Sequence, residues 1–237
     1  MGQQPPVIGI AGDVDFAPGG DASAPPTPRS CCRMTYIEAV VKAGGLPLVL
    51  PPVPGQIEDQ LDRVDGVLLI GGDDPRTEPF GLPTDPRTTP VAPLRQSYDT
   101  ALLAALSSRP DMPTLGVCYG MQMMALVAGG ALHQHLPDVL GETWTHHWDR
   151  THAIFPHPGS PGWLLEAAPH QPLSRHRQAV ATAGTLCVIG SSEDAIAEAI
   201  SDPRRRFYVG VQWHPERSGN GPLGLGVYSV FVRACRG

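Results

Sequence analysis

The 237-residue chain is 41% apolar and 17% charged, which is close to the average of globular proteins and excludes a mostly disordered or fibrous protein. Its formal net charge of -6, with Arg204, Arg205 and Arg206 as the longest basic run, excludes a nucleic-acid partner. The sequence has neither a signal-peptide pattern nor a run of ~20 apolar residues, which excludes a membrane partner and predicts a cytoplasmic location.

Short apolar runs alternate with helical patterns through the first half of the chain. The predicted elements are strands at residues 7–10, 46–50, 67–70 and 114–117 and helices at residues 34–43, 57–64, 94–106 and 121–127. Alternation of strand and helix favours a parallel sheet with helices on both faces. The expected fold class is therefore α/β, with a doubly wound, mostly parallel sheet in a single domain of residues 1–237.

The second half of the chain has a weaker pattern. Residues 131–168 show poor periodicity and no element is assigned to them. Beyond them the sequence predicts strands at residues 195–200 and 207–212 and a closing helix at residues 223–234.

Two segments rich in Pro, Gly and Ser, residues 13–30 and 71–93, each follow a predicted strand. A doubly wound sheet places its ligand-binding loops at this end of its strands. We therefore predict that both segments are active-site loops rather than domain linkers.

Cys118 stands between a predicted strand and a predicted helix, with Gly116 and Gly120 two residues to either side. This spacing is that of a nucleophile elbow, with sulfur in place of oxygen. The glycines permit a tight turn, and the start of the helix directs N–H groups and its positive dipole end at the sulfur, which favours a thiolate. The pattern predicts that Cys118 is a nucleophile rather than an ordinary core cysteine.

A thiol nucleophile needs a base, and the base needs an orienting group. His214 and Glu216 follow the predicted strand 207–212 and are separated by Pro215. Because extended backbone places alternate side chains on the same side, the carboxylate can accept a hydrogen bond from the imidazole. The predicted catalytic residues are therefore Cys118, His214 and Glu216, as nucleophile, base and orienting group.

These motifs resemble the class I glutamine amidotransferase family, and within it the branch of γ-glutamyl-γ-aminobutyrate hydrolases, peptidase C26. The resemblance is carried by Gly-Val-Cys-Tyr-Gly-Met-Gln at residues 116–122 and Val-Gln-Trp-His-Pro-Glu at residues 211–216. Further similar segments are residues 36–51, 69–74, 79–81, 128–134 and 174–180. The resemblance covers most of the chain and implies the amidotransferase-like variant of the flavodoxin-like fold.

The resemblance implies hydrolysis of a γ-glutamyl amide bond in a small molecule, through a γ-glutamyl thioester on Cys118, without a cofactor. It also implies that the backbone N–H groups of Gly72 and Tyr119 form the oxyanion hole. The residues expected to bind the substrate are Gly71, Gln122, Ser174, Arg175, His176 and Arg177. A leaving amine that carries a carboxylate would suit Arg175 or Arg177, because guanidinium groups bind carboxylates in a bidentate manner.

Three positions depart from the pattern of this branch and leave the substrate class open. Tyr119 stands where the branch usually has arginine, and Ala125 and Leu173 stand where it tends to have asparagine. Two alternatives therefore remain: a glutaminase subunit that delivers ammonia to a separate synthetase, and a noncatalytic or thiol-sensing binder of a small ligand. A homodimer is possible under each of these interpretations.

Four potential metal ligands lie close together in sequence, at His146, His147, Asp149 and His152. Consecutive histidines point apart in an extended segment, and cysteine-dependent amide cleavage needs no metal. The family has a histidine similar to His152 in this region. We therefore expect no metal here and a structural or pocket-lining role for His152.

Overall fold

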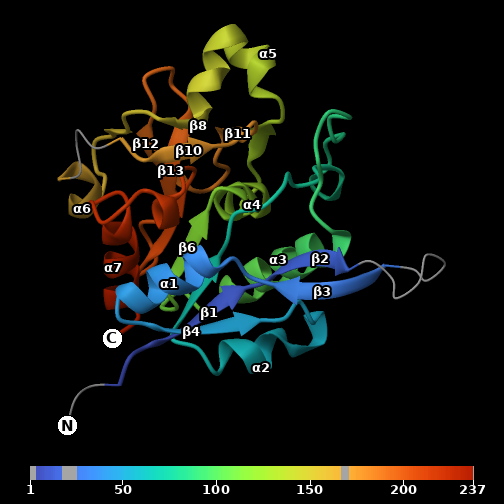
Figure 1. Cartoon of the computed structure of the whole chain (residues 1–237), viewed down its shortest axis with the longest axis vertical. Helices are drawn as coiled ribbons and strands as arrows, with labels where there is room; N and C mark the ends of the chain where they lie inside the picture. The colour runs from blue at the N-terminus through green and yellow to red at the C-terminus, as the bar shows by residue number, and fades with distance from the viewer. Residues whose placement is uncertain (1–3, 18–25, 167–170, 237) are drawn as a thin grey trace.

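A computed structural model describes residues 4–17, 26–166 and 171–236, and its central element is a ten-stranded sheet (Figure 1). Five of its strands run parallel in the spatial order β4-β1-β5-β6-β14. They are β1 (Val7–Ala11), β4 (Leu46–Leu50), β5 (Gly66–Leu69), β6 (Thr114–Val117) and β14 (Tyr208–Val211). Numbered along the chain, this is the order 2-1-3-4-5 of flavodoxin-like folds, which confirms the predicted fold class.

An antiparallel extension continues the sheet beyond β14. Its strands are β13 (Ala197–Ser201), β11 (Ala179–Thr182), β7 (Ala131–His133), β12 (Cys187–Ser191) and β9 (Phe155–Pro156). Beside it, β8 (Trp148–Thr151) pairs with β10 (Leu173–Arg175). The elements within residues 131–168 are too short to produce a detectable period; they include α5 (Leu136–Leu140), the 3₁₀ segment η3 (Gly141–His147) and α6 (Gly162–Leu165).

Helices cover both faces of the parallel part of the sheet. The first face packs against α1 (Met34–Lys42) and α7 (Leu225–Ala234), and the second against α2 (Ile57–Leu61), α3 (Pro93–Leu106) and α4 (Tyr119–Val127). Alternate residues of β5 enter the two cores, since Leu68 faces the first and Val67 and Leu69 face the second. No helix in the described ranges is long and apolar enough to cross a membrane, and the cytoplasmic location stays a prediction.

The two predicted loops differ in structure. Within residues 13–30, β2 (Asp13–Ala17) and β3 (Thr27–Cys31) form an antiparallel pair rather than irregular backbone, and residues 18–25 lie outside the described part; the active-site role of this segment stays a prediction. The cross-strand ion pair between Arg29 and Asp15, at 2.9 Å, joins the two strands. Residues 71–93 are mostly irregular, with the 3₁₀ turn η2 (Glu78–Phe80) and an isolated β-bridge between Asp74 and Pro90, and they bring Gly72, Asp73 and Asp74 to a cavity.

Candidate active site

Cys118 occupies a sharp turn between β6 and α4. Its φ angle is +51°, in the left-handed region that residues other than glycine rarely adopt, and only 5% of its surface is exposed. A Cβ atom at Gly120 would collide with the backbone carbonyl of Leu69, and one at Gly116 would lie 2.8 Å from the backbone carbon of Gly120. Only glycine fits on either side of Cys118, which is the requirement expected of a nucleophile elbow.

His214 is carried to Cys118 by parallel strand pairing. β14 lies directly beside β6, with Val211 opposite Val117, so the residues that follow both strands meet at one edge of the sheet. An ideal Cβ atom built on Gly71 would lie 3.0 Å from His214 Cε1 and 3.5 Å from Cys118 Cβ, which places both side chains against the same glycine.

Glu216 contacts the imidazole of His214. Its Oε1 atom lies 2.8 Å from His214 Nδ1, and both side chains are buried. The short 3₁₀ turn η4 (Pro215–Arg217) provides this geometry, in place of the fully extended backbone that the sequence predicts. Because the carboxylate can only accept, Nδ1 carries the hydrogen and Nε2 remains for proton exchange with Cys118.

The surroundings of His214 favour its protonated form. Burial alone lowers the pKa of its imidazole, but the charge of the Cys118 thiolate, a hydrogen bond with that group, and Glu216 raise the pKa more strongly, to about 10. His214 is therefore an imidazolium at neutral pH when Cys118 is a thiolate.

Tyr36 contacts Gly71 close to Glu216 and Cys118, and sequence reasoning did not identify it as a site residue. The N–H of Gly71 donates to its hydroxyl oxygen at 3.0 Å. Burial, followed by the neighbouring charges of Glu216 and Cys118, raises the pKa of Tyr36 well above its ordinary value, so this hydroxyl stays protonated. No local pattern distinguishes Tyr36 from the other apolar-facing residues of its helix.

Gly72 and Tyr119 are the residues predicted to form the oxyanion hole. Gly72 lines the same cavity as Cys118, and its N–H has no backbone acceptor among the residues that the structure describes. Tyr119 is the first residue of α4, so its N–H has no acceptor within the helix.

The buried side chain of Arg95 contacts the backbone before Gly72 and the ring of Tyr119. Sequence reasoning did not identify it as a site residue. Only 1% of its surface is exposed. Its guanidinium donates to the carbonyls of Ile70 (2.9 Å) and Gly71 (3.1 Å) and lies 4.3 Å from the centre of the Tyr119 ring. A Cβ at Gly72 would collide with this guanidinium. An arginine at the start of a helix is usually solvated, so only the tertiary structure reveals this role.

A cavity of about 330 Å³ opens above Cys118 and His214. Gln122 and His176 line it as predicted, although both are buried. The amide nitrogen of Gln122 donates to the carbonyl of Gln178 and to the side chain of Gln212. Two other predicted residues are placed differently: Gly71 lies behind the cavity, and Ser174 is fully buried without lining it.

Gln178 also lines the cavity and was missed as a candidate site residue. Its side chain is buried, and neither its Oε1 nor its Nε2 has a hydrogen-bond partner in residues 4–17, 26–166 and 171–236. A buried amide without partners is costly unless a ligand satisfies it. Gln178 is thus a candidate for direct contact with a substrate.

Arg175 and Arg177 lie at the mouth of the cavity, and both are exposed. Their guanidinium carbons lie 4.9 Å and 4.2 Å, respectively, from the centre of the Trp148 ring. Arg175 also pairs with Asp149, at 3.1 Å. The backbone carbonyl of Arg175 lies 4.0 Å from Cys118 Sγ, so this residue reaches the reacting centre through its main chain.

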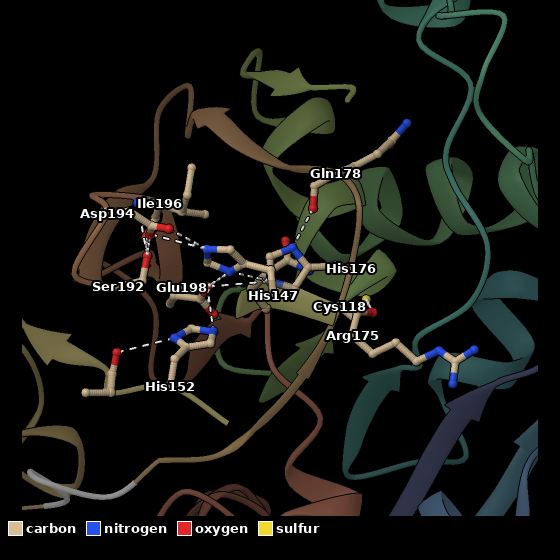
Figure 2. A network of polar contacts seen from close by, with 12 residues as sticks. Cys118, His147, His152, Arg175, His176, Gln178, Ser192, Asp194, Ile196 and Glu198 are labelled. Carbon is tan, nitrogen blue, oxygen red and sulfur yellow. Dashed lines mark hydrogen bonds and ion pairs between the residues drawn. The ribbon is translucent and has the colours of Figure 1, made fainter. Parts of the chain in front are cut away.

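The histidines at residues 146–152 are separated by the fold. His146 is exposed, whereas His147 is buried and, with His152, meets His176 and Glu198 in one cluster (Figure 2), of which His176 also lines the cavity. These four residues could hold a metal ion. Sequence reasoning did not select Glu198 or combine His176 with the other histidines, because the four come from segments far apart in the chain.

Comparisons with known proteins agree with this architecture. The family model Peptidase C26 matches residues 6–216. A Mycobacterium tuberculosis protein named as a glutamine amidotransferase is 32% identical over 92% of this chain and 72% of its own length. The γ-glutamyl-γ-aminobutyrate hydrolase of Escherichia coli K12 is 29% identical over 85% of each chain.

Solved structures with the same fold are more distant in sequence. A GMP synthase component from Thermoplasma acidophilum, so named in its description, has a TM-score of 0.63 at 15% identity, covering 98% of this chain and 94% of its own. The glutaminase domain of Trypanosoma brucei CTP synthase has a TM-score of 0.58 at 16% identity, covering 97% and 93%.

Proposed function

The chain belongs to the peptidase C26 family, and from this premise we propose that it hydrolyses the γ-glutamyl amide bond of a small molecule through a thioester on Cys118. The observation that carries the proposal is the strained turn at Cys118, set against the buried pair of His214 and Glu216 at the floor of one cavity. A backbone conformation of this kind persists where the surrounding structure enforces it, and such positions cluster at active sites.

In the proposed acylation step, the Cys118 thiolate attacks the γ-carbonyl carbon of the glutamyl group. The carbonyl oxygen becomes an oxyanion and accepts hydrogen bonds from the N–H groups of Gly72 and Tyr119. The carbon–nitrogen bond then breaks, and the His214 imidazolium gives its Nε2 proton to the leaving amine. The products of this step are the free amine and a γ-glutamyl thioester.

Hydrolysis of the thioester uses the same groups in reverse. His214, now neutral, takes a proton from water, and the hydroxide attacks the thioester carbonyl. Glutamate leaves and the sulfur departs as a thiolate, which restores the ion pair with His214. Glu216 stabilises the imidazolium in both steps through its contact with Nδ1.

The glutamyl half of the substrate is bound by buried amides in this proposal. The N–H groups of Gln122 are already used by Gln178 and Gln212, which leaves its Oε1 as an acceptor for the α-ammonium group. The unpartnered Nε2 of Gln178 is a donor for the α-carboxylate. Together they would distinguish a glutamyl amide from a simple amide.

The leaving amine is proposed to carry a carboxylate, which Arg177 binds. Arg175 is already paired with Asp149, whereas the Arg177 guanidinium rests on Trp148 at the mouth of the cavity. Because both arginines are exposed, solvent screens the attraction, and each contributes less than a buried pair would.

The test measures amine release by the purified chain from γ-glutamyl-γ-aminobutyrate, a γ-glutamyl derivative of a neutral amine, and glutamine. We expect cleavage of the acidic compound to be fastest. The Arg177→Ala variant should lower kcat/KM for the acidic compound by about 2- to 5-fold and leave that for glutamine nearly unchanged. Arg204→Ala, at an exposed arginine outside the cavity, is the control. Equal losses of kcat/KM on all three compounds would show that Arg177 does not bind the carboxylate of the leaving amine.

The second candidate function is that of a glutaminase subunit that passes ammonia to a separate synthetase. The same Cys118 chemistry would release ammonia from glutamine, and a synthetase would then be a partner. The likeness to the two solved structures, at 15% and 16% identity, extends to the fold only and does not favour this candidate. Glutamine cleavage faster than cleavage of every amine derivative would favour it.

A further inference from the structure

We propose that His147, His152, His176 and Glu198 form a binding site for one Zn²⁺ ion beside the catalytic cavity. The four residues come from separate elements: His147 ends η3, His152 follows β8, His176 lies between β10 and β11, and Glu198 belongs to β13. One ligand atom from each residue lies within 4.8 Å of the other three (Figure 2).

Four of the six distances between these atoms are close to the edges of a zinc tetrahedron. His147 Nδ1 lies 3.3 Å from His176 Nε2 and 3.2 Å from Glu198 Oε1. Glu198 Oε1 lies 3.4 Å from His152 Nε2 and 3.5 Å from His176 Nε2. Zinc–nitrogen and zinc–oxygen bonds of about 2.0 to 2.1 Å give ligand-to-ligand distances of about 3.3 to 3.4 Å in a tetrahedron.

Hydrogen bonds outside the cluster turn the ring lone pairs inward. The Nδ1–H of His176 donates to the carbonyl of Gln178 at 2.8 Å, and His147 Nε2 lies 3.0 Å from a carboxylate oxygen of Asp194. In neutral rings this leaves lone pairs on His176 Nε2 and His147 Nδ1, which face each other. Metal-binding histidines typically donate their second N–H to a carbonyl or carboxylate in this way.

The carboxylate of Glu198 and the Nε2 atom of His152 have no partner outside the cluster among the described residues. Glu198 is 0% exposed, and in the described part of the chain neither of its carboxylate oxygens, nor His152 Nε2, has a hydrogen-bond partner. Among the described residues Glu198 Oε1 contacts only the three imidazoles, at 3.2 to 3.5 Å, and a divalent cation bound between these groups would offset the desolvation cost of the buried carboxylate. The unpartnered atoms therefore point to an ion at the centre of the cluster.

Three imidazoles and one carboxylate suit Zn²⁺, and four protein ligands leave no open position for a catalytic water. The ion would therefore have a structural rather than a catalytic role. His176 lies between Arg175, whose carbonyl faces Cys118, and Gln178, whose carbonyl accepts from Gln122. Binding would fix this part of the cavity wall to β13 and η3.

The experiment adds Zn²⁺ to the metal-stripped chain in competition with a chromophoric chelator. We expect one ion per chain with a dissociation constant below about 1 µM, as structural zinc sites have. The His152→Ala variant should bind at least about 100-fold more weakly, since loss of an outer hydrogen-bond partner alone costs about 10- to 100-fold. Asp194→Ala removes such an outer partner and should fall within that smaller range.

The matched control is His146→Ala, at the exposed neighbour of His147, which should bind Zn²⁺ like the parent chain. Substitution of Co²⁺ into the parent chain gives a test that does not depend on the folding of any variant, and should produce the intense visible absorption of four-coordinate cobalt. Binding weaker than about 1 µM, a weak six-coordinate cobalt spectrum, or equal binding by His152→Ala would overturn the proposal. If protonated histidines paired with Glu198 take the place of a metal ion in this cluster, Zn²⁺ would bind more weakly than about 1 µM.

Discussion

The backbone of Cys118 is held in an unfavourable conformation by two hydrogen bonds. Its N–H donates to the carbonyl of Val211 at 2.7 Å, and its carbonyl accepts from the N–H of Gln122 at 3.1 Å. A positive φ at a residue other than glycine costs on the order of 1 to 3 kcal/mol, which the packing of β14 and α4 around it must offset. The conformation places the sulfur at the cavity and beside the pair of His214 and Glu216.

Replacement of Glu216 by glutamine tests its role as the orienting group. The amide keeps a contact with His214 but cannot stabilise an imidazolium, so we expect kcat to fall by about 100-fold or more with little change in KM. Glu142→Gln, at an exposed carboxylate, should behave like the parent. A variant with full turnover at position 216 would show that another carboxylate orients His214.

The raised pKa of His214 gives a pH-dependent signature. The folded value is about 10, against about 6.5 in the unfolded chain. A raised folded pKa contributes stability that is fully present below pH 6.5 and is lost as the pH rises through about 10. We expect the imidazole to remain protonated at pH 8, observed by NMR of the ring protons.

Removal of the thiol provides the control for this titration. In Cys118→Ala the strongest influence that raises the pKa of His214 is gone, while burial still lowers it, so the ring should titrate much closer to its ordinary value. Identical titration of His214 in the two proteins would contradict an ion pair between these residues.

At the scale of elements, α3 supports the loop after β5 and the start of α4 through one side chain. Arg95 binds the carbonyls of Ile70 and Gly71, stacks on Tyr119 and pairs with Asp13 of β2 at 2.8 Å. Both proposed oxyanion donors thus rest on the same buried guanidinium. Their spacing depends on an element that contributes no group to the chemistry itself.

Substitution of Arg95 should affect stability and turnover separately. Arg95→Met leaves nearby carboxylates without their cation, and we expect a loss of about 3 to 5 kcal/mol in the free energy of unfolding. Arg95→Lys keeps the charge but loses the planar contacts, and should lower kcat more than it changes KM. Arg63→Met, at an exposed arginine, should change stability by less than about 0.5 kcal/mol. Unchanged kcat in Arg95→Lys would show that Arg95 does not position the proposed oxyanion donors.

The sequence predicted most of the parallel half and little of the antiparallel half. Apolar strands such as residues 67–70 and 114–117 are buried on both faces, so their pattern is local and strong. The strands β7, β9 and β10 have two or three residues each and exist only through their pairing. The pair of β2 and β3 was hidden by its turn-forming composition.

The same distinction applies to the site. Cys118, His214 and Glu216 stand in short contiguous motifs that local chemistry explains. Arg95 has no such motif, and Gln178, although it lies in the family-like segment 174–180, is not distinguished there by local chemistry, because both roles arise from burial, which depends on the whole fold. The cluster of four metal-ligating residues likewise becomes visible only when distant segments are brought together.

At the scale of the whole molecule, the parallel half of the sheet and the antiparallel extension contribute different parts of the cavity. The parallel half supplies Cys118, His214 and the loop at Gly72, while the segment between β10 and β11 supplies the opposite wall of the cavity. Under the proposed function this one chain contains every group that the reaction needs. A synthetase partner would be required only for the alternative in which ammonia is the useful product.

The most direct test of the central claim is mass spectrometry of the chain after rapid acid quenching during turnover of γ-glutamyl-γ-aminobutyrate. We expect a fraction of the protein to gain the mass of one glutamyl group, and peptide mapping to place that group on Cys118. Cys118→Ala should gain nothing and release no amine. Amine release that persists in Cys118→Ala, or a glutamyl group attached to a different residue, would contradict the account.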